Sequence, residues 1–228
     1  MRAMDLLQQR RAFLTGVAAT ALSLPFAGAV NAMGLGLGSI LGKASDSALD
    51  KLAQPGAFFD DPAIRIGLPI LGGGGLVGSL LKAGDKVGLL GGLTRKLNDA
   101  AGVAAGEAKP IFRDAIGNLS LADVPGIASE NDGATRYLRK SSGDELHEKL
   151  RPLINSALGD LGAFKQLDSL SAKHSFLASA GIDRDGLGKT VTDQGLDGIF
   201  NYIGAEESNL RANPLGKAGG LLKGVLGN

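Results

Sequence analysis

The 228-residue chain contains no cysteine and no tryptophan, and only two tyrosines and two histidines. Without cysteine, disulfides, thiolate zinc sites and a cysteine nucleophile are excluded, and we expect no lipid anchor. The formal net charge is +1. This near-neutral balance and the scarcity of aromatic rings for base stacking argue against a nucleic-acid partner. Nothing in the sequence predicts a cofactor.

Patterns typical of β-strands are also missing, because no segment alternates apolar and polar residues for long enough. Alanine and leucine are abundant, and 36 glycines are spread through the chain. Each glycine inside a helix costs about 1 kcal/mol relative to alanine. The sequence therefore predicts an all-α fold, a single-domain bundle of short helices with glycine-rich loops, over residues 33–228.

Residues 1–32 have the order of regions found in an export signal. A twin-arginine-like motif precedes a short apolar stretch, and the motif consists of Arg10, Arg11, Phe13 and Leu14. The small residues ending at Ala32 predict cleavage there, and hence a periplasmic protein; a second site ends at Ala29. Losing Arg2, Arg10, Arg11 and Asp5 would change the net charge from +1 to −1. Twin-arginine and general export both remain open, and an amphipathic first helix of the mature fold is the alternative.

Residues 190–214 carry the densest helical apolar pattern and predict the central core helix. Its apolar face is formed by Leu196, Ile199, Phe200 and Ile203. We expect Thr192 and Asp193 to cap its start after a polar loop at 181–188. Asn213-Pro214 should end it.

Weaker patterns predict the remaining helices. They cover residues 44–53, 76–82, 89–107, 134–140 and 217–226, with a further helix near Phe164. Pro110 either kinks the 89–107 helix or starts the next one. Capping boxes predict helix starts at Ser120 and Ser142, and Pro152 should bend the second of these helices. The glycine run 72–75 lacks the Lys-Ser/Thr of a phosphate-binding loop, so we interpret it as a flexible connection. Residues 64–68 alternate and should run extended.

Five segments together resemble a known family. They are FFDDPAIRIGLP (58–69), LNDAA (97–101), KPIF (109–112) with Ala115-Ile116, ATRYLR (134–139) and VTDQGLDGIF (191–200), the last followed by Glu206-Glu207, Arg211 and Asn213-Pro214. The chain resembles the bacterial proteins of domain of unknown function 4197 over about residues 44–226. The resemblance implies a small, exported, helical protein and brings no activity, ligand or catalytic residue. Two departures are the glycine content of 72–92 and Gly67, where the family prefers proline.

The candidate functional surface consists of Arg136, Arg139, Glu206, Glu207 and Arg211. Adjacent helical residues point about 100° apart, so the two glutamates should not share a site. We expect one of them to pair with Arg211 instead. His147 lies between carboxylates, but the spacing matches no metal motif, so a solvated charged face is the preferred interpretation. No catalytic or metal-binding residue is predicted.

Two functional hypotheses follow. The first is a non-enzymatic periplasmic protein that binds a protein partner or an apolar ligand, with peripheral membrane contact through the 217–226 tail as a further option. The second is a hydrolase that uses carboxylates with Arg136 or Arg139. A pocket in which these arginines converge with Glu206 or Glu207 would favour the hydrolase.

Overall fold

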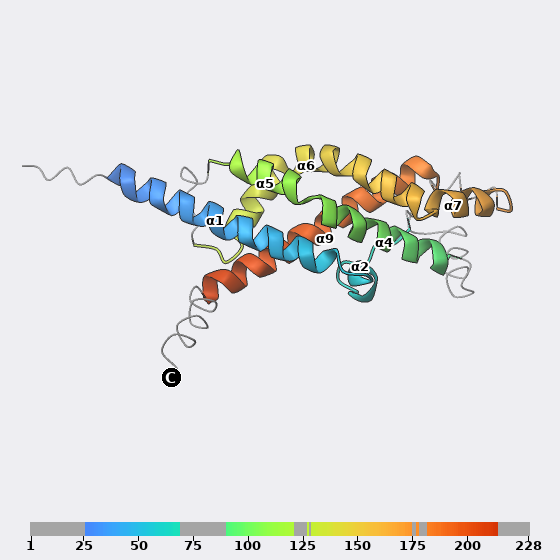
Figure 1. Cartoon of the computed structure of the whole chain (residues 1–228), viewed down its shortest axis with the longest axis horizontal. Coiled ribbons are helices and arrows are strands. Elements are labelled where there is room, and N and C mark those ends of the chain that lie inside the picture. Colours follow the sequence, from blue (N-terminus) through green and yellow to red (C-terminus); the bar gives the residue numbers. More distant parts are fainter. Residues whose placement is uncertain are drawn as a thin grey trace, which may run out of the picture.

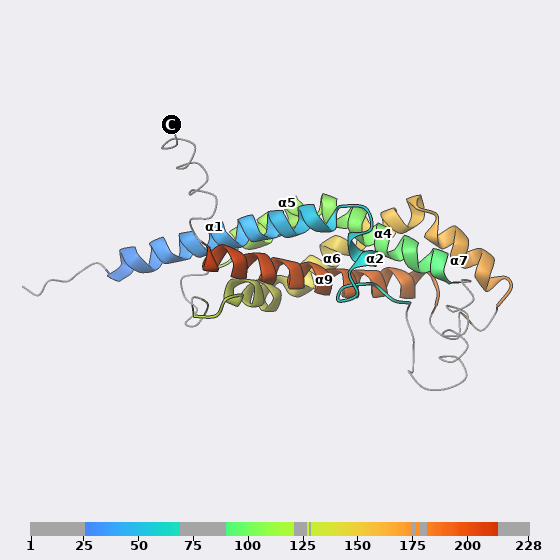
Figure 2. The ribbon, with the colours of Figure 1, turned by 90° about the horizontal axis from the view of Figure 1, so that it is seen from below.

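The computed structural model describes residues 26–68, 90–120, 127, 129–174, 177 and 182–213, with side chains from Gly36 onward. These residues form seven helices and no strand: α1 (Phe26–Leu52), α2 (Ala57–Asp60), α4 (Gly91–Glu107), α5 (Lys109–Gly117), α6 (Gly133–Asp160), α7 (Ala163–Ser171) and α9 (Arg184–Ala212). The helices form one elongated bundle (Figures 1 and 2). The predicted all-α, single-domain class is confirmed, although α1, α6 and α9 are longer than the short helices expected.

Helix α9 packs most extensively against α6 and α1. The four apolar residues predicted to form its core face, Leu196, Ile199, Phe200 and Ile203, are all buried. Phe200 meets Phe112 of α5 edge-on, with ring centroids 6.1 Å apart, a favourable aromatic geometry. The sequence pattern therefore identified the core-facing residues of this helix correctly.

The close approach of α2 and the chain after it to α9 depends on Gly198. A Cβ there would lie 3.0 Å from a ring carbon of Phe58 and 3.2 Å from the Cβ of Ile64. Because both neighbours are buried, neither has free space to move into. Glycine at this position lets α2 and the chain after it lie directly against α9.

The predicted start of α9 is wrong. The helix begins at Arg184, where Asp183 is the N-cap and accepts a hydrogen bond from the Gly186 amide at 2.7 Å. Thr192 is buried within the helix, and its hydroxyl donates to the Gly188 carbonyl at 2.7 Å. The expected loop at 181–188 is therefore mostly helix, because Leu187 and Val191 are buried and extend the packed face N-terminally.

The predicted break before Ser142 is also wrong, since α6 runs continuously through it. Residues four apart along α6 form one buried stripe, namely Leu138, Ser142, Leu146, Leu150 and Ile154. Ser142 occupies a core position in this stripe, so tertiary packing overrides the local capping signal. Pro152 lies inside the helix, as expected.

Helix α1 is much longer than the predicted 44–53 segment, and it passes through the predicted cleavage site at Ala32. Its N-terminal part extends beyond the neighbouring helices (Figure 1). Buried side chains appear from Leu37 onward among the residues described. No helix in the described ranges is both long and apolar enough to cross a membrane.

Helices α4, α5 and α7 match the expected segments, and Pro110 lies in the first turn of α5. The alternation at 64–68 is reflected in burial, because Ile64 and Ile66 are buried and Arg65 and Gly67 are exposed. The glycine run 72–75, the 76–82 helix, most of the segment after Ser120, the 217–226 tail and the signal motif lie outside the described residues.

Candidate functional site

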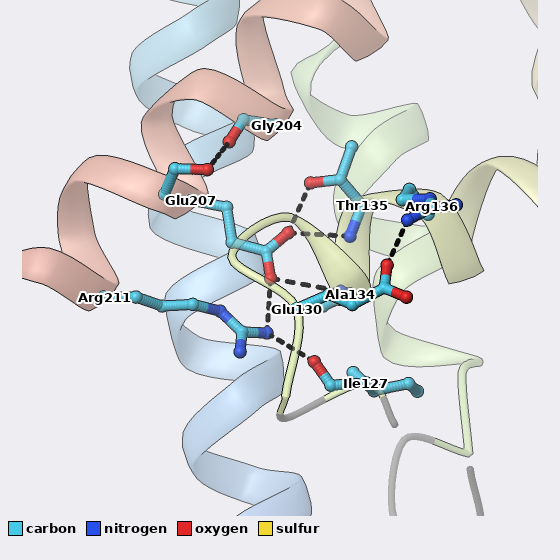
Figure 3. A network of polar contacts seen from close by, with 9 residues as sticks. Ile127, Glu130, Ala134, Thr135, Arg136, Gly204, Glu207 and Arg211 are labelled. Carbon is cyan, nitrogen blue, oxygen red and sulfur yellow. Dashed lines mark hydrogen bonds and ion pairs between the residues drawn. The ribbon is translucent and has the colours of Figure 1, made fainter. Parts of the chain in front are cut away.

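Glu207 of α9 is fully buried and lies at the N-terminus of α6 (Figure 3). Its carboxylate accepts hydrogen bonds from the amides of Ala134 at 3.1 Å and Thr135 at 2.7 Å, and from the Thr135 hydroxyl at 2.6 Å. The first amides of a helix have no partner within the helix and carry a partial positive charge. The residue at the N-cap, Asp132, makes no side-chain cap. Glu207 therefore caps α6 from a different helix.

Arg211 completes this network (Figure 3). Its guanidinium forms an ion pair with Glu207 one turn earlier on α9, and it donates to the Ile127 carbonyl at 3.1 Å. The predicted pairing of Arg211 with one of the two glutamates is confirmed. A Cβ at Gly133 would lie 2.4 Å from the Ile127 carbonyl oxygen, so the chain at Ile127 can close over the start of α6 only because residue 133 is glycine.

Glu206 faces another helix. It accepts a hydrogen bond from the Ser47 hydroxyl of α1 at 2.9 Å and forms an ion pair with Lys51. The two adjacent glutamates thus bind different neighbours, as the helical rotation of about 100° per residue predicts. They stabilise the two main contacts of α9 and do not form a carboxylate pair.

Arg136 and Arg139 line a hollow between α6 and α9 with a volume of about 270 Å³. Arg136 pairs with Glu130, whereas Arg139 pairs with Asp197 and lies 5.2 Å from the ring centre of Phe200. We call this the polar hollow; its other lining residues are Asp132, Thr135, Phe200, Asn201, Gly204, Ala205 and Ser208. Neither Glu206 nor Glu207 lines it, so the arginines and the glutamates of the candidate surface do not converge.

A larger groove of about 430 Å³ lies along α4, and sequence reasoning missed it. One face of α4 contributes Arg95, Asn98, Asp99, Gly102 and Val103. The other lining residues are the turn at 53–57, Phe58, Asp60 and Leu161. We call this the α4 groove. Among the described residues, the exposed large hydrophobic side chains are Val103 (46%) and Leu161 (36%), and both lie in this groove.

The floor of the α4 groove is fixed by hydrogen bonds. The buried Asn98 amide accepts from the Ile66 backbone amide at 2.8 Å and donates to the Ile66 carbonyl at 2.9 Å. It also donates to the Thr94 carbonyl at 2.8 Å. Phe58 is buried beside it. This part of the groove is therefore preformed, as is common for ligand sites.

The charged residues of the α4 groove differ in how they are engaged. The Arg95 guanidinium lies 4.3 Å from the ring centre of Phe59, and Arg65 lies 4.9 Å from the same centre. Both distances are typical of cation–π contacts. The side-chain carboxylates of Asp60 and Asp99 accept no hydrogen bond and form no ion pair with the residues described.

His147, which the sequence placed on a solvated charged face, instead joins α6 to α9. Its Nε2 lies 2.8 Å from Asp193, which also pairs with Lys189. Partial burial acts to raise the pKa of Asp193, but hydrogen bonds from Lys189 and His147 outweigh it and hold the pKa below its usual value. In the described part of the chain, no three His, Asp or Glu side chains gather in a geometry that could hold a metal ion.

Comparison with known proteins places these features in a family. The comparisons with curated proteins and with solved structures give no match. A family model described as a protein of unknown function, DUF4197, matches residues 29–227, nearly the whole chain. The match covers α9 with its two glutamates, the polar hollow and the α4 groove, and the chain therefore belongs to the DUF4197 family.

Proposed function

We propose that the protein is exported to the periplasm and acts there as a non-enzymatic binding protein, with the α4 groove as its binding face. The observation that carries this proposal is the position of Val103 and Leu161. Scattered exposed hydrophobic side chains are normal, but here both lie in one groove with a fixed floor. Grooves of about 300–1,000 Å³ that combine apolar walls with a few polar groups are typical binding sites.

The alternative is a hydrolase built on carboxylates and arginines. Such chemistry needs a carboxylate directed at the substrate. Each glutamate of the candidate surface is engaged by a neighbouring helix, and neither lines the polar hollow. This arrangement supports structural roles for Glu206 and Glu207, and it favours binding over hydrolysis.

Binding to the α4 groove can be tested with the neutral fluorescent dye Nile red. We expect the full-length protein to bind the dye, and Val103→Ser combined with Leu161→Ser to weaken this binding at least about tenfold. Both side chains are exposed, so the variant should keep its helical circular dichroism. Leu210→Ser, which changes a half-buried leucine near the end of α9, is the matched control.

Equal dye binding by the protein and the double variant would contradict the proposal. Turnover of generic ester or phosphoester substrates that is lost in Arg136→Gln would favour the hydrolase instead.

A further inference from the structure

We infer that the α4 groove binds an extended peptide segment in which Lys or Arg alternates with aliphatic residues. This inference rests on the proposed binding function and adds the chemistry of the occupant. It follows from two properties of the groove: exposed aliphatic side chains and an excess of negative over positive charge.

The apolar part of the groove suits aliphatic side chains. Val103 and Leu161 are branched and aliphatic, and both are accessible. Val103 lies in α4, and Leu161 directly follows α6. A volume of about 430 Å³ is enough for a few aliphatic side chains. An extended segment can place alternate side chains into such a groove and direct the others to its rim.

The negative charge comes first from Asp60 and Asp99. Neither carboxylate has a hydrogen-bond or ion-pair partner among the described residues. Arg95 also lines the groove and offsets one of these two charges, so one negative charge remains in excess. Arg95 lies over the Phe59 ring, and Lys96 donates to the Leu161 carbonyl at 2.8 Å.

The C-terminal ends of two helices add to the negative electrostatic potential of the groove. Helix α1 ends at Leu52 and α6 ends at Asp160, and the residues that follow both ends, Ala53 and Leu161, line the groove. The C-terminus of a helix carries a partial negative charge of about half a unit. Lys96 offsets this charge at the end of α6. The groove therefore favours a cation held next to aliphatic groups, and it disfavours anions.

The test uses three dye-labelled peptides that alternate leucine with one other residue: lysine, glutamine or glutamate. Affinity for the full-length protein is measured by fluorescence anisotropy at low salt. We expect the leucine–lysine peptide to bind at least about tenfold more tightly than the leucine–glutamate peptide, with the glutamine peptide in between. Exposed charge pairs contribute a factor of about two to five each, and salt should weaken the preference.

Asp60→Asn with Asp99→Asn should remove most of the preference for lysine and leave the binding of the glutamine peptide unchanged. Asp144→Asn is the matched control, because Asp144 is an exposed carboxylate on α6 outside the groove. It should leave the preference intact.

The outcomes separate this inference from the proposed function. If all three peptides bind equally and Val103→Ser with Leu161→Ser weakens all of them, the groove binds but the inferred charge preference is wrong. If no peptide binds, both the inference and the binding of peptides at this groove are overturned.

Discussion

Replacing Glu207 by glutamine tests the role of the buried network most sharply. The substitution keeps the shape of the side chain but removes its charge, and it directs an NH₂ group at donors that the carboxylate now accepts from. Two backbone amides, one hydroxyl and the Arg211 guanidinium point at the two carboxylate oxygens. A glutamine side chain has a single oxygen, which can replace only one of the two carboxylate oxygens. At least one donor that points at the other position therefore loses its acceptor.

The loss is large because Arg211 has only 14% of its side chain exposed. Removing one partner of a buried ion pair typically costs about 3–5 kcal/mol, since the other charge stays buried. With a urea m value of about 2 kcal/mol/M, the unfolding midpoint should fall by about 1.5–2.5 M.

The neighbouring residue provides the control. The Glu206 side chain is only 14% exposed, but its partner Lys51 is 56% exposed and is solvated by water once the carboxylate is removed. The loss at this position should therefore be only about 1 kcal/mol. Urea unfolding of the full-length protein, Glu207→Gln and Glu206→Gln, followed by circular dichroism, measures the difference. If the two variants lost similar stability, or if Glu207→Gln lost less than about 1 kcal/mol, the reasoning about this network would be refuted.

Three further predictions follow from the described contacts. Gly133→Ala should destabilise the protein by about 1–3 kcal/mol because the new Cβ would collide with the Ile127 carbonyl. Gly143→Ala on the same helix places its Cβ where nothing lies within 4 Å, so it should stabilise the protein by up to about 1 kcal/mol. Thermal unfolding of the two variants measures the difference. Because the folded-state pKa of Asp193 is lowered, its contribution is present above the unfolded-state pKa of about 3.9 and is lost as the pH falls through the folded value. Urea unfolding at pH 7 and pH 3 should therefore show a smaller acid-induced loss for Asp193→Asn, and an unchanged loss would contradict the assignment. Fractionation of expressing cells followed by mass spectrometry should find a periplasmic form that begins at Met33. An uncleaved cytoplasmic chain would contradict the export proposal. Arg10→Lys with Arg11→Lys should block twin-arginine export only, so this variant distinguishes the two routes.

The fold class and the core-facing residues of α9 were predictable because both depend on apolar periodicity. The spacing of Leu196, Ile199, Phe200 and Ile203 identifies a buried face whatever the partner helix is. The pairing of Arg211 on α9 was also predictable, because residues four apart on a helix are neighbours.

Helix starts were predicted poorly because local capping signals compete with long-range packing. Ser142 and Thr192 both precede residues typical of a first helical turn, yet both are buried inside long helices. Asp183, the N-cap of α9, lies in a segment rich in glycine and charge that resembles a loop. The energy of extending a packed face exceeds that of one cap.

The two structural roles of the glutamates and the α4 groove lay beyond the sequence. That Glu207 reaches the start of α6, more than 70 residues away, depends on the packing angle between helices and not on any local pattern. The groove is assembled from the end of α1, the face of α4 and Leu161. Val103 looks in the sequence like another core residue of an alanine-rich helix, and only the structure shows it exposed.

The central claim is that the α4 groove is the binding face, and mapping backbone amide NMR shifts with the leucine–lysine peptide tests it most directly. At 23.1 kDa the full chain is suited to this measurement. We predict saturable shifts for residues 53–60, 95–103 and 161, and unchanged resonances for residues 201–208 beside the polar hollow. Shifts confined to the polar hollow, or no saturable shifts in the groove, would contradict the claim.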